Sequence, residues 1–130
     1  MDNGGNIWVT ELNTNKIARF EPEEETFTEY DIPTRRSFPS DVVVDSGGRV
    51  WYTEQDANQI GVFDPVSRSF KEYEVPTIQS LPYRIAIDIH GNIWFTEFYG
   101  NKVGMFDVQK EVFKEYSIPT SASRPVGIAT

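Results

Sequence analysis

Three glutamates recur at one spacing and are the residues of this sequence best suited to holding a cation. Glu11, Glu54 and Glu97 lie 43 residues apart, and each ends a segment that contains a tryptophan. Carboxylate oxygens are the ligands that hard cations such as Mg²⁺ and Ca²⁺ prefer. A ring of these carboxylates is therefore a candidate cation site. The alternative is that each carboxylate accepts backbone N–H groups or pairs with a neighbouring Lys or Arg.

A second group of candidates lies at equivalent positions whose residue types differ from one copy to the next. Ser40-Asp41, Tyr83-Arg84 and the equivalent Val126 all follow a proline. A structural repeat does not require an acid in one copy and a base in the next. These residues predict a site for a small polar or anionic ligand, which Tyr83 and Arg84 would hold. The alternative is a salt bridge between neighbouring repeats.

Few of the residue types that enzymes use are present. The chain has no cysteine, which excludes a disulfide, a thiolate zinc site and a cysteine nucleophile. Its single histidine, His90, lies in a glycine-containing turn, where we expect an exposed side chain; a general base or metal ligand is the alternative. We assign no catalytic residue and no metal ligand from the sequence.

The elements that position these residues follow from an internal repeat of 43 residues, which runs through three copies without insertion or deletion. Trp8, Trp51 and Trp94 mark it most clearly. The same step links further sets of three: Asn15, Asn58 and Asn101; Phe20, Phe63 and Phe106; Tyr30, Tyr73 and Tyr116; Pro33, Pro76 and Pro119. A period of about 40–45 residues, with four short strands in each unit, is typical of the blades of a β-propeller.

The sequence therefore predicts an all-β chain with one domain over residues 1–130. Apolar runs bounded by Gly, Pro and Asp predict four-stranded blades at about 39–77 and 82–120. The first blade, at about 2–34, has only three strands, and residues 125–130 would supply a fourth strand to such a blade.

Three blades are too few for a ring, because propellers need about four to eight. An open arc would expose two apolar sheet faces, which is unusual for a soluble monomer. We therefore expect a homodimer that closes a six-bladed ring, in which the last strand of each chain pairs with the first blade of the other. The rival hypothesis is that the chain is a piece of a longer propeller.

The overall charge narrows the classes of partner. Twenty acidic and twelve basic residues give a formal net charge of −8. This balance argues against nucleic acid and anionic membrane surfaces as partners. The chain shows neither a signal-peptide pattern nor an apolar run of the roughly 20 residues that a membrane span needs. We expect a soluble chain, and the sequence does not indicate a compartment.

The repeat resembles that of the virginiamycin B lyase (streptogramin lyase) family. The resemblance rests on Gly-Asn-Ile-Trp-Phe-Thr-Glu, Asn-Lys-Val-Gly-Met-Phe-Asp and Phe-Lys-Glu-Tyr-Ser-Ile-Pro-Thr within Gly91–Thr120, and it extends over the whole chain. It implies seven-bladed propellers, of which three repeats are present here. It also implies a magnesium-dependent elimination that opens streptogramin B antibiotics at the lactone C–O bond.

This chain departs from the family at the positions of its catalytic residues. The resemblance implies histidines directly after the strand-opening proline and a glutamate before one such proline. The positions after the prolines hold Ser40, Tyr83 and Val126, and those before them hold Phe38, Leu81 and Arg124. We therefore expect a non-catalytic scaffold or binding module without a cofactor. The alternatives are a lyase, which alone would need Mg²⁺, and a carbohydrate-binding propeller that stacks sugars on tryptophan.

Overall fold

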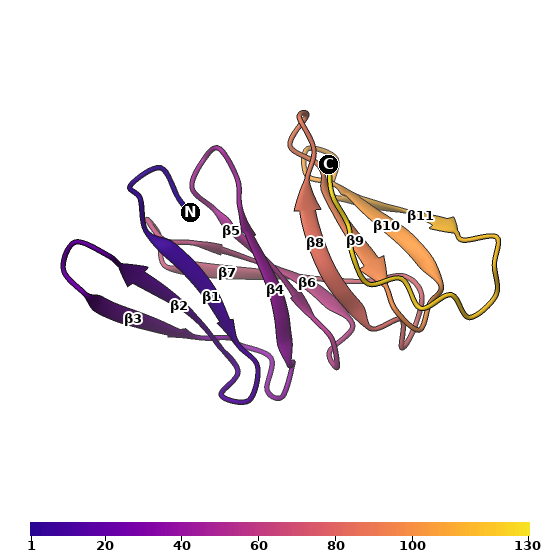
Figure 1. Cartoon of the computed structure of the whole chain (residues 1–130), viewed down its shortest axis with the longest axis horizontal. Coiled ribbons are helices and arrows are strands. Elements are labelled where there is room, and N and C mark those ends of the chain that lie inside the picture. The colour runs from indigo at the N-terminus through magenta and orange to yellow at the C-terminus, as the bar shows by residue number, and fades with distance from the viewer.

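The computed structural model describes residues 1–130 as eleven strands in three antiparallel sheets, arranged side by side along an arc (Figure 1). The first blade contains β1 (Ile7–Glu11), β2 (Lys16–Glu21) and β3 (Thr26–Asp31). The second contains β4 (Pro39–Val44), β5 (Val50–Glu54), β6 (Gln59–Asp64) and β7 (Ser69–Glu74). The third contains β8 (Pro82–Ile87), β9 (Ile93–Glu97), β10 (Lys102–Asp107) and β11 (Val112–Ser117). The predicted all-β class and the blade organisation are confirmed.

The turns between the first two strands of a blade depend on aspartate and glycine. Asp45 Oδ1 accepts the backbone N–H groups of Gly47 and Arg49, and Gly48 adopts a φ of 84°. The second oxygen of Asp45 accepts the indole N–H of Trp51 at 2.9 Å. Asp45 therefore forms this turn, and it also orients the tryptophan of the next strand.

The core lies between the sheets. In the first cluster, Trp8, Ile17 and Ile32 of blade 1 pack against Val50, Tyr52 and Phe63 of blade 2. The second cluster repeats this arrangement one blade further on, with Trp51, Ile60 and Val75 against Ile93, Phe95 and Phe106. The tryptophans are therefore inter-blade core residues wherever a following blade exists. Trp94 has no following blade and is only partly buried.

The predicted strand at Val126–Thr130 does not form. The segment lies beside blade 3, where Thr96 Oγ1 of β9 donates to the Val126 carbonyl and Thr130 Oγ1 donates to the Ile87 carbonyl of β8. A strand needs a neighbour that takes its backbone hydrogen bonds, and no fourth blade offers one here. The segment thus occupies the position of a next first strand without becoming one. The structure holds no helix with the length and apolar character that a membrane crossing requires.

Candidate functional site

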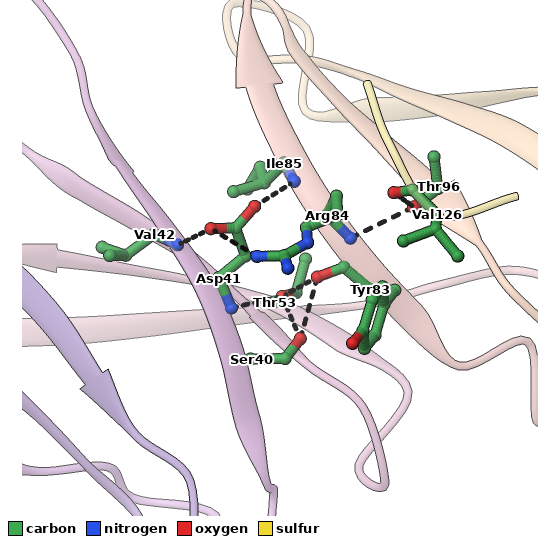
Figure 2. A network of polar contacts seen from close by, with 9 residues as sticks. All are labelled: Ser40, Asp41, Val42, Thr53, Tyr83, Arg84, Ile85, Thr96 and Val126. Atoms are coloured by element: carbon green, nitrogen blue, oxygen red, sulfur yellow. Dashed lines mark hydrogen bonds and ion pairs between the residues drawn. The ribbon is translucent and has the colours of Figure 1, made fainter. Parts of the chain in front are cut away.

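The four sequence-predicted ligand residues are brought together between blades 2 and 3 (Figure 2). The pairing of β4 with β5 shifts between Pro39 and Val42, and the pairing of β8 with β9 shifts in the same way between Pro82 and Ile85. Ser40-Asp41 and Tyr83-Arg84 are the residues inside these two irregularities. A bulge turns side chains away from the regular alternation of a strand, which explains why these pairs reach the neighbouring blade.

Hydroxyl groups join the two blades at this point. Ser40 Oγ lies 2.8 Å from Thr53 Oγ1, and both hydroxyls are within hydrogen-bonding distance of the Tyr83 carbonyl, at 2.8 and 2.9 Å. Thr53 Oγ1 also accepts the backbone N–H of Asp41. Ser40 is therefore occupied in holding β4 to β8.

The Asp41 carboxylate forms a second connection between the same blades. Its Oδ1 accepts the N–H of Val42 and its Oδ2 accepts the N–H of Ile85 across the gap, both at 3.0 Å. Arg84 Nη1 lies 3.7 Å from Oδ1, so the inter-blade ion pair considered for these residues is present. Because Asp41 bonds two backbone amides as well as facing a cation, its role here is structural.

Tyr83 and Arg84 retain free polar groups. The Arg84 side chain is 46% exposed and its guanidinium lies 5.2 Å from the centre of the Tyr83 ring. The Tyr83 ring in turn lies 5.9 Å from the ring of Phe98, and Arg124 lies over the other end of this row. Guanidinium groups beside aromatic rings can bind an anionic group and stack on a planar one.

The repeated glutamates have a different environment from the one that a cation ring requires. Glu54 and Glu97 are fully buried, and their four carboxylate oxygens have no hydrogen-bond partner. The nearby Ser37 hydroxyl donates to Asn15 Oδ1 instead. Glu11 lies at the surface end of the series, where it accepts the Thr14 hydroxyl.

Burial is the main reason that both interior glutamates are weak acids. It raises the pKa of Glu54 to about 8, and the carboxylate of Glu72 adds to the effect. Burial likewise raises the pKa of Glu97 to about 7, where Glu115 raises it further and Lys102 opposes the change. No group of three or more His, Cys, Asp and Glu side chains is placed to hold a metal ion. The cation ring of Glu11, Glu54 and Glu97 thus stays a prediction that the geometry does not strengthen.

Sequence reasoning missed two sets of positioning residues. The hydroxyls of Thr53 and Thr96 each reach the next blade's first-strand segment. Asn58 donates to the carbonyls of Val75 and Thr77, and its Oδ1 accepts both the N–H and the hydroxyl of Ser80. Both types recur every 43 residues, and that recurrence at a polar position was the signal available in the sequence.

Two further candidates are placed without ambiguity. His90 is exposed in the turn before β9, where its backbone N–H donates to Asp88 Oδ1, as expected for a turn residue. Trp8 and Trp51 are buried to 6% and 1% exposure, so neither offers a face for a sugar. Of the three tryptophans only Trp94 keeps an accessible surface, and that surface belongs to the open face of blade 3.

Comparison with known proteins places this geometry in one family. The description "Virginiamycin B lyase family" matches residues 1–130. Selenomethionine-substituted virginiamycin B lyase from Staphylococcus aureus is 34% identical with a TM-score of 0.89, covering 96% of this chain and 42% of that one. A comparison with curated protein sequences found no match.

Two further solved structures agree with this match. A catalytically inactive histidine-to-alanine variant of the S. aureus enzyme, solved with quinupristin, is 32% identical with a TM-score of 0.90, covering 97% of this chain and 42% of that one. A streptogramin B lyase structure is 32% identical with a TM-score of 0.91, covering 97% of this chain and 41% of that one. The chain thus spans about two fifths of the length of these relatives.

Proposed function

The chain belongs to the virginiamycin B lyase family, and from that premise we propose that these three blades form a non-catalytic scaffold that assembles with a second copy and binds a small polar ligand. The observation that supports this proposal is the residue type directly after the proline that opens the first strand of each repeat. The resemblance implies histidine at the positions of Ser40, Tyr83 and Val126, and none of the three has an imidazole. An elimination needs a general base and an acid for the leaving oxygen.

The solved relatives support the importance of histidine. Replacing one histidine by alanine accompanies the catalytically inactive state of the S. aureus enzyme that was solved with quinupristin. The only histidine of this chain, His90, is exposed in a turn outside the region of Tyr83 and Arg84. Ser40, at one of the histidine positions, is engaged with the Tyr83 carbonyl.

The carboxylates of the chain do not fit the Mg²⁺ ion that the resemblance implies. The carboxylate oxygens of Glu54 and Glu97 are buried, so they offer no exposed surface to a cation. Asp41 uses both oxygens on backbone N–H groups. We therefore derive no catalytic step through magnesium.

The ligand site of the proposal is the exposed row that starts at Arg84 and Tyr83. The only ion contact of Arg84 is the 3.7 Å approach to Asp41, and its side chain is 46% exposed, so the guanidinium keeps N–H donors for a ligand. A guanidinium with free donors suits a carboxylate or phosphate group, and the Tyr83 ring beside it suits a planar apolar group. The proposed ligand class is thus a small anion that carries a ring.

One paired experiment tests the scaffold proposal. The chain is incubated with quinupristin and Mg²⁺ and the lactone is followed by mass spectrometry, while light scattering behind a sizing column gives the absolute mass in solution. We expect an unopened lactone together with a species of twice 14.9 kDa, which corresponds to the six-bladed ring of two chains. Magnesium-dependent opening of the lactone would overturn the non-catalytic role, and a strict monomer would overturn the assembly.

A further inference from the structure

We propose that a cleft between blades 2 and 3, next to the turns that open β5, binds a small zwitterion, an α-amino acid with an aliphatic side chain. This site is separate from the scaffold role and from the row at Tyr83 and Arg84. β5 begins directly after Arg49, which lines the cleft, and ends at Glu54, which pairs with Pro39. The two sites therefore lie towards opposite ends of the contact between these blades.

The cleft has one wall from each blade. Trp51, Val62 and Lys71 lie opposite one another in three paired strands, so their side chains point to the same face of blade 2. The turn after β10 forms the other wall with Val108 and Glu111. Both blades have their full four strands. The volume of about 220 Å³ is smaller than the roughly 300–1,000 Å³ of sites for drug-sized molecules, so the cleft suits a small ligand.

Arg49 is fixed in place and still has donors for a ligand. Its Nε donates to Asp45 Oδ2 at 2.8 Å, and its guanidinium lies 5.4 Å from the centre of the Trp51 ring. The side chain is 45% exposed, and its two terminal nitrogens make no hydrogen bond within the chain. The parallel N–H groups of a guanidinium match the two oxygens of a carboxylate. Because Arg49 is already ordered, holding a carboxylate costs it little further rotamer entropy.

Glu111 supplies an acceptor from the opposite wall. Its Oε1 accepts both the Lys71 ammonium and the Tyr73 hydroxyl, whereas its Oε2 has no partner. The hydrogen bond from Lys71 holds the pKa of Glu111 below its usual range, so this carboxylate is ionised at neutral pH. Asp64 has a second unused oxygen, since only its Oδ1 accepts N–H groups of its own turn. Carboxylate oxygens in these positions suit the ammonium group of a ligand.

The charges of the cleft favour a molecule that carries both signs. Two cations, Arg49 and Lys71, and two carboxylates, Asp64 and Glu111, line it. A plain anion would meet both carboxylates, and a plain cation would meet the guanidinium and the ammonium. An α-amino acid instead offers its carboxylate to Arg49 and its ammonium to Glu111. The apolar surface between these charges suits an aliphatic side chain.

The repeat itself does not require this arrangement. The contact between blades 1 and 2 has other residue types at its three most important positions: Asn6, Thr28 and Arg68 stand where Arg49, Lys71 and Glu111 stand here. Arg19 takes the place of Val62 and donates to Glu21 Oε1 at 2.8 Å. A long side chain thus occupies the face that is hollow between blades 2 and 3, so the cleft is specific to one contact of the chain.

Three probes with one aliphatic skeleton test the ligand class: L-leucine, isocaproate, which lacks the amino group, and isoamylamine, which lacks the carboxylate. Each is titrated into isotope-labelled protein, and backbone amide shifts in NMR spectra report where it binds. We expect leucine to shift the amides of Arg49, Lys71, Val108 and Glu111. It should bind at least about fivefold more tightly than either singly charged probe, because only leucine pairs with both walls.

The outcomes of these titrations are distinct. If isocaproate binds as tightly as leucine, the zwitterion is overturned as the ligand class. If leucine shifts no amide of the cleft at any concentration, the site itself is overturned. Shifts confined to the surroundings of Tyr83 and Arg84 would also overturn it, while they would support the ligand site proposed there.

Charge-removing variants test the two walls. Arg49→Gln should weaken leucine binding about tenfold or more, because it removes a charge-assisted pair. Arg68→Gln is the matched control, the same change at an exposed arginine outside the cleft, and should alter binding less than about twofold. Glu111→Gln and Glu25→Gln form the second pair, at equivalent positions of blades 3 and 1. The dispersion of each NMR spectrum verifies folding. Equal losses in a variant and its control would overturn the site.

Discussion

Blade 2 and blade 1 carry nearly the same second strand in different surroundings. β5 reads Val50-Trp51-Tyr52-Thr53-Glu54 and all five residues are buried. β1 reads Ile7-Trp8-Val9-Thr10-Glu11, and only its tryptophan is buried. The two strands have the same place in their sheets, apart from the first strand that blade 1 lacks. Burial in this fold is therefore a property of the neighbours on both sides and not of the strand sequence.

The two blades also differ in how they fill the space over the third strand. Tyr52 lies opposite Gly61 and Phe95 lies opposite Gly104, whereas Val9 lies opposite Ala18. A Cβ at Gly61 would lie 2.2 Å from Cζ of Tyr52. A large ring on the second strand therefore requires glycine on the third, and blade 1 combines a smaller residue with alanine. The summed volume of the two opposite side chains is therefore similar in each blade, although the residue types differ.

Removing the tryptophan side chain is the strongest way to test the difference in burial. Trp51→Ala should lower the free energy of unfolding by about 3–5 kcal/mol, because Trp51 is enclosed between blades 2 and 3. Trp94→Ala should cost about half as much, since the open face of blade 3 leaves Trp94 partly exposed. Both indoles donate to a turn aspartate, so that loss is shared. Urea unfolding followed by circular dichroism, at one protein concentration, measures the difference; equal losses would contradict it.

The buried glutamates Glu54 and Glu97 make the stability of blades 2 and 3 depend on pH. The pKa of Glu54 is about 8 in the folded chain and near 4.5 as a free group, so the folded state holds its proton over this interval. The contribution of Glu54 to the free energy of unfolding is therefore greatest below about pH 4.5 and falls as the pH rises towards 8. Glu54→Gln should remove this fall and exceed the wild type by on the order of 2–4 kcal/mol at pH 8–9.

Matched variants check the assignment of that pH dependence. Glu11→Gln makes the same chemical change at the equivalent position of blade 1, where the side chain is only partly buried, and serves as the control variant. Glu97→Gln should act over a narrower interval, because its pKa rises only to about 7. A wild-type profile that does not fall between pH 4.5 and 8 relative to Glu54→Gln would refute a protonated Glu54.

Exchanging the paired residues of the two blades tests the conserved volume. Gly61→Ala should cost about 1–3 kcal/mol, because the added methyl group collides with the Tyr52 ring. In a Tyr52→Val background the same change should be nearly neutral, since Val opposite Ala is the pair that blade 1 already contains. A double-mutant cycle by urea unfolding gives the coupling. Additive effects would show that the two positions do not share one space.

Much of this fold could be predicted from the sequence because the repeat is regular. Trp8, Trp51 and Trp94 and the turn aspartates set the period, and the observed strands recur with that period. The strand at Val126–Thr130 could not be predicted correctly from the pattern alone, because a strand forms only where another strand offers hydrogen bonds. The period shows which strand of the repeat a segment corresponds to. The segment forms that strand only where a neighbouring strand can pair with it.

The candidate site could be predicted only in part. The differing residue types at Ser40-Asp41 and Tyr83-Arg84 correctly indicated side chains that meet between blades. They did not show that Asp41 would accept the amide of Ile85, since the bulge that turns it there depends on strand register. The burial of Glu54 was also missed, because a terminal strand position gives no indication of which loop covers it.

Asp41 and Arg84 occupy the same position of the repeat, Asp41 in blade 2 and Arg84 in blade 3. Asp41, on an inner blade, links β4 to the Ile85 amide, so Asp41→Ala should cost about 1–2 kcal/mol by leaving backbone N–H groups unpaired. Arg84, one repeat later on the end blade, is half exposed with a single long ion contact, so Arg84→Ala should change stability by less than about 0.5 kcal/mol. Urea unfolding measures both. If Arg84→Ala proved as costly as Asp41→Ala, Arg84 would be part of the connection between blades, and its free donors would no longer support a ligand site.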